Sequence, residues 1–444
     1  MQYAQFMQLL NDWFLGWPLI IFAITVGIAC TIACNFVQIR YFLTAWKELV
    51  ASLTSQGPKG DVTPLQAFIN TLSANLGNGS LAGMAVAIHA GGPGAAFWVV
   101  VIGLLMMSVR FAEVYLSIHV GARANIKSGL GGPMLYLKDV VGGKALAWLY
   151  AVCCLLFGLS LGNGIQANTI GLSLQTILGV PTIVTAVLLG AFIWYIVTGG
   201  SQRISKASEA IVPIKVGVFF VASIIVLGYH YAAIIPALQL IFASAFKTTA
   251  LTGGILGFSV QQAMRFGMAT GFMANESGLG TAAILFSSTG SKTPVKDALM
   301  SMISTFISIT VCFMISLCII ASGVDAWSSE TMTSSALTIA AYSTVFGKLG
   351  GWIVTFLSIT FGVGVAVSFA YISREAWLFV TGGRGSILAF NILYTAFAFV
   401  FPLLSVSLVW GFAEIMNACL LVINLLGIAY LLPVVRKGLQ NFKG

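Results

Sequence analysis

The sequence predicts an all-α polytopic membrane protein of eleven transmembrane helices, in which one extra N-terminal helix precedes two five-helix repeats. Three observations carry this prediction. Hydrophobic residues make up 59% of the 444-residue chain and charged residues only 7%, against roughly 25% charged residues in a soluble domain. The basic residues gather in alternate loops. Two apolar segments that lie far apart along the chain are interrupted by glycine.

Each expected helix is an apolar run of about 20 residues, the length that crosses a bilayer. The first run is the extra helix, the first repeat covers 65–230, the second covers 250–432, and the chain 1–444 is expected to form a single transmembrane domain. A short helix is expected at 335–346, within the longest outer loop. The eleven runs lie at 14–37, 65–90, 95–118, 145–167, 182–199, 209–230, 250–273, 297–322, 350–372, 386–406 and 410–432.

The basic residues set the expected orientation. Lys247 and Lys348 lie in loops on one side and Arg110 and Lys215 lie inside spans, so that seventeen of the 21 Lys and Arg residues remain for the other side. Cytoplasmic loops carry the excess of Lys and Arg. We therefore expect the N-terminus outside and the C-terminus in the cytoplasm. The net charge of +9 is then a topology signal and gives no indication of nucleic-acid binding.

The second expected span contains a polar, glycine-rich stretch, LGNGS at 76–80. Irregular backbone is tolerated at membrane depth only where it is buried in protein or lines a wet cavity. Close helix packing is the alternative, because Gly79 and Gly83 have the spacing of a small-xxx-small contact. Packing leaves three polar side chains unexplained, those of Asn75, Asn78 and Ser80. We therefore favour an interrupted helix.

The seventh expected span has a similar stretch, in which Thr252, Gly253, Gly254 and Gly257 fall near its outer half. Glycine-interrupted spans in corresponding positions of two halves indicate an inverted-repeat transporter with its binding site between them. The two interrupted spans are five apart, and because five is odd the two repeats must run in opposite orientations.

An interrupted helix exposes peptide groups that suit a zwitterion. The free N–H groups at the start of a half-helix carry partial positive charge and favour a carboxylate. The freed carbonyls favour a small cation. No acidic residue stands near the middle of either expected interruption, so an amine is expected to be held by carbonyls, dipoles and amide side chains.

Four ordered stretches resemble those of the alanine or glycine:cation symporter family, also called the sodium:alanine symporter family, of the amino acid–polyamine–cation superfamily. The resemblance covers nearly the whole chain, from about residue 10 to 434. It implies a LeuT-type fold, no cofactor, and transport of small neutral amino acids with sodium or, in some members, protons. The four stretches are GNGSLAGMAVAIHAGGPGAAFW (77–98), GGPMLYL (131–137), RFGMATGFMANESGLGTAAI (265–284) and VWGFAEIMNACLLVINLLGI (409–428).

The resemblance also implies a site, residue by residue. The backbone N–H groups of Asn78 and Gly79 would hold the substrate carboxylate. The other residues expected to face the substrate are Asn75, Ser80, Asn163, Gln166, Thr252, Gly253, Gly254, Ile255 and Phe369. The sodium ion would be bound by Ser73, Leu76, Val365 and Ser368.

The ninth span departs from the family pattern. It reads FGVGVAVSFAYISRE at 361–375 and keeps one hydroxyl, that of Ser368, where the family has a Ser-Thr pair. The tryptophan that caps the family's pocket is replaced by Phe369 or Ala370. These differences leave two coupling ions open, sodium and the proton, and favour a pocket wider than one for alanine.

Four charged residues inside or beside the spans have ordinary interpretations as well as functional ones. Arg110 and Glu113 are three apart on a helix and can pair, either as an anchor at the cytoplasmic boundary or as part of an inner gate. Glu276 is expected to cap the turn that follows it. Lys215 is expected to extend its ammonium toward the cytoplasmic surface.

The sequence therefore predicts a secondary active symporter that imports a small neutral amino acid, similar to alanine or glycine, with sodium. A proton-coupled transporter of the same fold with a wider substrate range is the alternative. A channel or a membrane enzyme is disfavoured, because neither a filter loop nor a cluster of titratable groups is apparent. We expect a monomer in the inner membrane, in contact with lipid and without nucleic acid.

Overall fold

The computed structural model describes residues 16–54, 61–123, 131–246, 249–250, 257–258, 260–324, 335–404 and 406–442. Apart from one antiparallel pair of two-residue strands, its regular elements are helices.

The N-terminal part forms α2 (Trp17–Ala33), α3 (Val37–Arg40) and α4 (Phe42–Thr54). The helices that follow are α5 (Pro64–Asn75), α6 (Asn78–Gly91), α7 (Gly94–Arg123), α8 (Pro133–Tyr136), the 3-10 turn η1 (Leu137–Asp139), α9 (Gly143–Phe157), the π-helix η2 (Gly158–Ile165), α10 (Gln166–Leu178), α11 (Thr182–Thr198), α12 (Gly200–Tyr229) and α13 (Tyr231–Phe246). The remainder forms β1 (Thr249–Ala250), β2 (Gly257–Phe258), α14 (Val260–Asn275), α15 (Thr281–Ser287), α16 (Pro294–Ala321), α17 (Ser335–Phe346), α18 (Lys348–Val380), α19 (Ile387–Val400), the 3-10 turn η3 (Phe401–Leu403) and α20 (Val406–Gln440).

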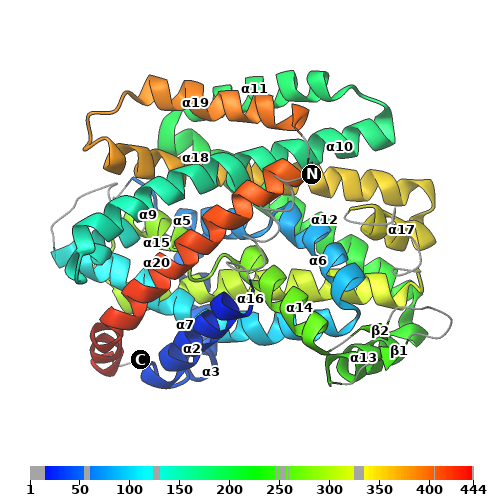
Figure 1. Ribbon diagram of the computed structural model, residues 1–444, viewed down its shortest axis with the longest axis horizontal. Helices are drawn as coiled ribbons and strands as arrows, with labels where there is room; N and C mark the ends of the chain where they lie inside the picture. The colour runs from blue at the N-terminus through cyan, green and yellow to red at the C-terminus, as the bar shows by residue number, and fades with distance from the viewer. Residues whose placement is uncertain are drawn as a thin grey trace.

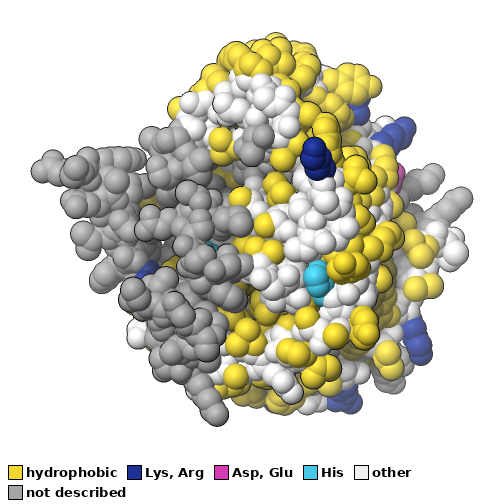
Figure 2. All heavy atoms as spheres, turned by 90° about the vertical axis from the view of Figure 1, so that its right-hand side faces the viewer, with side chains coloured by type: hydrophobic (Ala, Val, Ile, Leu, Met, Phe, Trp, Pro, Cys, Tyr) yellow, Lys and Arg dark blue, Asp and Glu magenta, His cyan; other side chains and the backbone are white. Residues whose placement is uncertain are grey.

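The predicted class, an all-helical membrane protein, is confirmed at this level. Within the described residues, 6 helical stretches are long and apolar enough to cross a membrane, and shorter apolar helices accompany them. Figure 2 shows hydrophobic side chains spread over one face, with few charged side chains among them. Large apolar side chains such as Leu188 (64% exposed) and Ile224 (59% exposed) face outward, as lipid contact requires. The short helix expected at 335–346 is α17.

The interrupted helices lie inside the bundle. In Figure 1, α5, α6, α14 and α15 occupy the middle, and α7, α16, α18 and α20 run past them. Helix α7 packs along both α14 and α16, and α18 packs against α5, α10 and α12. Helices α11 and α19 lie side by side at one edge of the molecule.

The first interruption lies where the sequence predicts one. Helix α5 ends at Asn75, and α6 begins at Asn78 with Gly77 in an extended conformation before it. The interruption is shorter than the glycine-rich stretch suggests, because Asn78, Gly79 and Ser80 already belong to α6. Asparagine, glycine and serine are tolerated in the first turn of a helix, whose N–H groups have no partner within the helix.

The second interruption among the described residues lies between α14 and α15. The expected span 250–273 is replaced by the short strands, followed by α14 (Val260–Asn275), which stops at the sequence ESGLG before α15. The glycine-rich residues 252–255 lie outside the described residues. The run 231–246, which lies between two expected spans, forms α13.

Small residues bring α14 against α7. A Cβ atom added to Gly267 would stand 2.5 Å from the Ala95 carbonyl oxygen and 2.8 Å from the Trp98 Cβ. A Cβ added to Gly271 would stand 2.3 Å from the Ile102 side chain. The glycines therefore set the spacing of the two helices, and this spacing positions the end of α14 at the second break.

This packing predicts that Gly267→Ala will destabilise the protein, because the new methyl group meets backbone that cannot move without shifting a helix. Overpacking of this kind costs about 1–3 kcal/mol, which a lower thermal midpoint of the detergent-solubilised protein will report. Gly121→Ala in α7 is the matched control, since a Cβ there meets nothing within 4 Å. Equal midpoints for the two variants would contradict the close-packing account.

Candidate functional site

A glutamine from another helix accepts a hydrogen bond from the backbone at the first break. The Asn78 backbone N–H donates to Gln166 Oε1 at 3.2 Å, and Gln166 Nε2 donates to the Leu161 carbonyl at 3.2 Å. Gln166 is the first residue of α10 and follows the π-helix η2. A π-helical turn widens the backbone locally and often occurs at functional sites. Here it directs the glutamine amide at the start of α6.

The carbonyl side of the first break is bound by an ammonium group. Lys215 Nζ, from α12, donates to the Ser73 carbonyl at 3.0 Å and to the Leu76 carbonyl at 2.8 Å. Lys215 is 0% exposed, so the expectation that it extends toward the cytoplasmic surface is wrong. Two carbonyls freed by the end of α5 offer it better partners than a distant interface.

The surroundings of Lys215 fit this ammonium. Its Nζ lies 5.3 Å from the centre of the Phe361 ring, within the range of a cation–π interaction. A Cβ added to Gly364 would stand 2.7 Å from Nζ, so glycine is needed for the close approach of α18. The Ser73 hydroxyl donates to the Gly364 carbonyl at 2.9 Å and closes this part of the site.

The second break has an unusual backbone. Between α14 and α15, Glu276 has φ 50°, Gly278 has φ 89° and Gly280 has φ 83°. This left-handed region is open to glycine but costly for a residue with a Cβ. The break therefore includes a glutamate. The expectation of no acidic residue concerns the middle of an interruption at 252–257, which lies mostly outside the described residues, whereas this break lies farther along the chain.

A buried ion pair holds the second break. Glu113 Oε2 accepts from the backbone N–H groups of Gly278 and Gly280, each at 3.1 Å, and Glu113 Oε1 pairs with Arg110 Nη1 at 2.9 Å. Asn424 Nδ2 donates to the same Glu113 Oε2 at 3.2 Å. Both members of the pair are 0% exposed. The pairing itself is as the spacing predicts, but it binds the interior break and does not anchor a surface.

Arg110 also connects the two breaks. Its Nη2 donates to the Asn275 carbonyl at 2.6 Å and to Asn75 Oδ1 at 3.4 Å. Asn275 ends α14 and Asn75 ends α5. One guanidinium therefore bridges the last residues of both interrupted helices, which explains why the planar, multiply donating arginine is used here.

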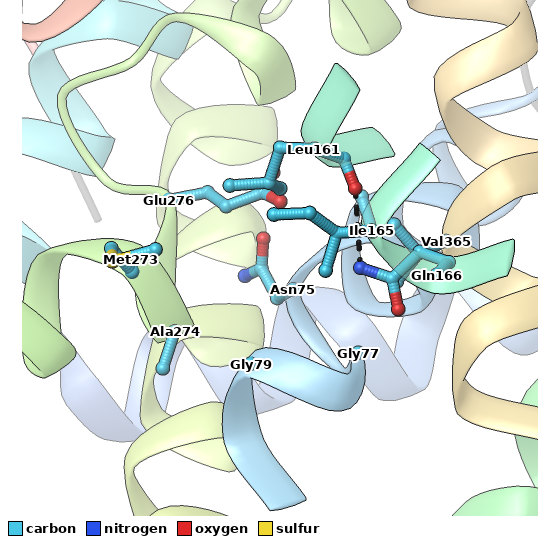
Figure 3. Close-up of a pocket in the computed structure, with 11 residues that line it drawn as sticks. Asn75, Gly77, Gly79, Leu161, Ile165, Gln166, Met273, Ala274, Glu276 and Val365 are labelled. Carbon is cyan, nitrogen blue, oxygen red and sulfur yellow. Dashed lines mark hydrogen bonds between the residues drawn. The ribbon is translucent and has the colours of Figure 1, made fainter. Parts of the chain in front are cut away.

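A small cavity lies between the two breaks. Figure 3 shows Asn75, Gly77 and Gly79 on one side of it, Met273, Ala274 and Glu276 on another, and Leu161, Ile165, Gln166 and Val365 closing it. Its volume is about 20 Å³, enough for one or two water molecules. Four residues predicted to bind substrate or cation therefore meet at one cavity: Asn75, Gly79, Gln166 and Val365.

Other predicted residues lie close to this cavity without lining it. The Asn78 side chain accepts from the Ser358 hydroxyl at 2.8 Å, and the Ser80 hydroxyl donates to the Asn75 carbonyl at 3.4 Å. Asn163 lines a second cavity that also touches Gln166, and its amide donates to the Tyr394 carbonyl at 2.7 Å.

Two further predicted residues, Phe369 and Ser368, do not line the cavity. Phe369 packs its ring against that of Phe157, with centroids 5.6 Å apart. Ser368 lies 3.4 Å from the Ser208 hydroxyl. The predicted substrate residues Thr252, Gly253, Gly254 and Ile255 lie outside the described residues.

Comparison with known proteins identifies the family. The model of the sodium:alanine symporter family matches residues 1–444. The chain belongs to this family. Its members are membrane transporters and not enzymes.

Several relatives are similar over nearly their whole length. An uncharacterized transporter of Haemophilus influenzae is 31% identical over 432 residues, covering 96% of this chain and 93% of that protein. The sodium/alanine symporter AgcS of Methanococcus maripaludis is 29% identical, covering 98% and 96%. A probable sodium/glutamine symporter, GlnT of Bacillus subtilis, is 27% identical, covering 97% and 89%.

The fold also resembles that of solved transporters. A sodium-coupled sialic acid symporter in a substrate-bound outward-open state aligns with a TM-score of 0.56 and 12% identity, over 95% of this chain and 87% of that one. At this level of identity the likeness concerns the fold alone.

Three charged residues of this site are hard to assign from the sequence. The pattern predicts ordinary roles for Lys215 and Glu276 and leaves Arg110 open between a surface anchor and part of an inner gate. The available signal was their position within or beside long apolar runs, since an ionisable residue there points to a functional site by default. Only the fold shows that α7, α12 and the second break face one another.

The buried pair predicts a non-additive response to mutation. Glu113→Leu leaves the Arg110 guanidinium without its carboxylate, and removing one partner of a buried pair costs about 3–5 kcal/mol. The double variant Arg110→Met/Glu113→Leu removes the stranded charge as well, so its loss of thermal midpoint will be smaller than the summed losses of Arg110→Met and Glu113→Leu. Additive losses would show that the ion pair does not hold the break.

Proposed function

We propose that this protein imports a small neutral amino acid with a cation by alternating access. The observation that supports this most is the cavity between the two breaks, which the start of α6 enters at Gly79. A helix start attracts a carboxylate, which would bind the Gly79 N–H and take the place of Gln166 Oε1 at the Asn78 N–H. The zwitterion of an amino acid matches that charge, and the family's named members include amino acid symporters.

The cavity wall supports a small substrate. Leu161, Ile165, Met273 and Val365 give it apolar sides, and a Cβ on Gly77 would already meet Val365 Cγ2 at 2.7 Å. A cavity of about 20 Å³ requires the helices to separate slightly around even an alanine. A long side chain would require a larger displacement of these four walls.

The hydrogen bonds between the breaks and the long helices beside them support alternating access. Each interrupted helix is hydrogen-bonded to a long helix beside it, α5 to α12 through Lys215 and the second break to α7 through Glu113. Rocking of one group of helices against the other would open the cavity to each side in turn.

We propose that the two groups are inverted five-helix repeats, 65–230 and 250–432, within eleven spans. The N-terminus then lies outside, the C-terminus in the cytoplasm, and the protein works as a monomer in the inner membrane.

Sodium is the first candidate for the coupling ion, as in the named relatives. Its expected ligands were Ser73, Leu76, Val365 and Ser368.

A proton is the second candidate, and the position of Lys215 favours it. The ammonium takes two of the carbonyls expected for sodium, and two cations cannot share them because like charges at such distances repel strongly. A charged Lys215 that stays on these carbonyls would supply their cation when no sodium is bound. Loss and return of the lysine proton during the transport cycle would couple transport to the proton gradient.

The coupling ion is tested by uptake into proteoliposomes at fixed pH in sodium or choline buffer. With Lys215 as the resident cation, uptake of alanine or glycine is equal in the two buffers and is driven by an inward proton gradient. A tenfold or greater loss in choline would establish sodium as the coupling ion and remove Lys215 from that role.

The substrate site is tested with two glycines of one helix. A Cβ on Gly79 meets no atom within 4 Å and Gly79 lines the cavity, so Gly79→Ala will fold normally and narrow the space for substrate. We expect at least a tenfold loss of uptake. Gly83→Ala is the control, because its Cβ makes an ordinary contact with Thr270 at 3.8 Å and lies outside the cavity. Normal uptake by Gly79→Ala would contradict the proposed site.

A further inference from the structure

Glu276 is the acidic residue in the wall of the cavity. It is only 2% exposed, yet it lines the space between the breaks. In Figure 3 its side chain extends from the second break toward the middle of the cavity, between Leu161 and Asn75. A buried carboxylate requires partners that offset the loss of water, so its existing bonds must be counted.

The Glu276 carboxylate has spare capacity. Its Oε2 accepts from the Thr281 hydroxyl at 3.1 Å, and among the described residues this is the hydrogen bond that the carboxylate receives. An ionised carboxylate has about four acceptor positions. The carboxylate of Glu113, on α7, differs from that of Glu276. Its two oxygens accept hydrogen bonds from Arg110, from two backbone N–H groups and from Asn424. Glu276 is therefore the acid that can accept a ligand.

The backbone of Glu276 adds an independent observation. Its φ of 50° is one of three positive values at non-glycine residues in the described chain. Glycine occupies the positive-φ positions 278 and 280 of the same break, and glycine at 276 would relieve the strain. A side chain kept at such a position is typical of residues that meet a ligand.

We propose that the Glu276 carboxylate binds the α-ammonium group of the substrate. This inference rests on the proposed amino acid transport and names the recognition of its amine. The substrate then lies across the cavity with its carboxylate toward the first turn of α6 and its ammonium toward the second break. Each break therefore binds one of the two charged groups of the zwitterion.

The surrounding charges define the substrate class. Arg110 and Glu113 form a buried ion pair, and Lys215 and Glu276 are buried beside the breaks as well, so the site holds two basic and two acidic side chains. A neutral zwitterion enters without changing this balance. A lysine or arginine substrate would bring an uncompensated positive charge, and an N-acylated amino acid would offer no ammonium. The protein is therefore selective for neutral amino acids with a free amino group.

Binding of alanine and of propionate, which is alanine without its amino group, tests this assignment. The measurement is competition against radiolabelled alanine on purified protein, with wild type, Glu276→Gln and Glu276→Asp. Because a hydrogen bond to a charged group is worth roughly 10- to 150-fold in affinity, Glu276→Gln will weaken alanine binding by that factor. Propionate binding will hardly change, so the preference for alanine over propionate falls by the same factor. Glu276→Asp will restore part of the preference.

Glu209→Gln, a half-buried glutamate of α12, is the matched control and will keep the wild-type preference. Equal weakening of alanine and propionate by Glu276→Gln, or an unchanged affinity for alanine, would overturn the inference and leave Glu276 with a structural role. Failure of the proposed function would be seen separately, as wild-type protein that binds no amino acid.

Discussion

The structure depends on one constraint, that peptide groups freed inside a membrane protein must find partners away from water. Two helices are interrupted inside the bundle. Buried charged or amide side chains hydrogen-bond to the backbone groups that each interruption leaves unpaired. Lys215 donates to the carbonyls before the first break and Gln166 accepts from the amide after it. At the second break, Arg110 donates to a carbonyl and Glu113 accepts from two amides.

These side chains come from three different helices, so the shape of the cavity depends on how those helices sit relative to one another. Gln166 belongs to α10, Lys215 to α12, and Arg110 with Glu113 to α7. A movement of any of these helices pulls directly on a break. Binding at the cavity is thereby linked to the arrangement of the bundle, which is the physical requirement for opening to one side at a time.

The sequence predicts the class and the first break, because these depend on local composition, whereas the residues expected at the site come from the family resemblance and stay predictions. The run LGNGS marks the first break within two residues, and Gln166 was assigned to the site. The sequence does not predict the break between α14 and α15, because glycine content is a poor guide to a bend that relies on positive φ at two glycines and at Glu276. The partners of Lys215 come from segments about 140 positions away, and no local pattern reports such a contact.

An experimental structure of the protein with alanine bound in lipid nanodiscs tests the central claim most directly. The account predicts density for one alanine between the first turn of α6 and the break between α14 and α15, with the Lys215 ammonium on the carbonyls of Ser73 and Leu76. Alanine bound outside this cavity, or α14 and α15 joined as one continuous helix, would contradict it.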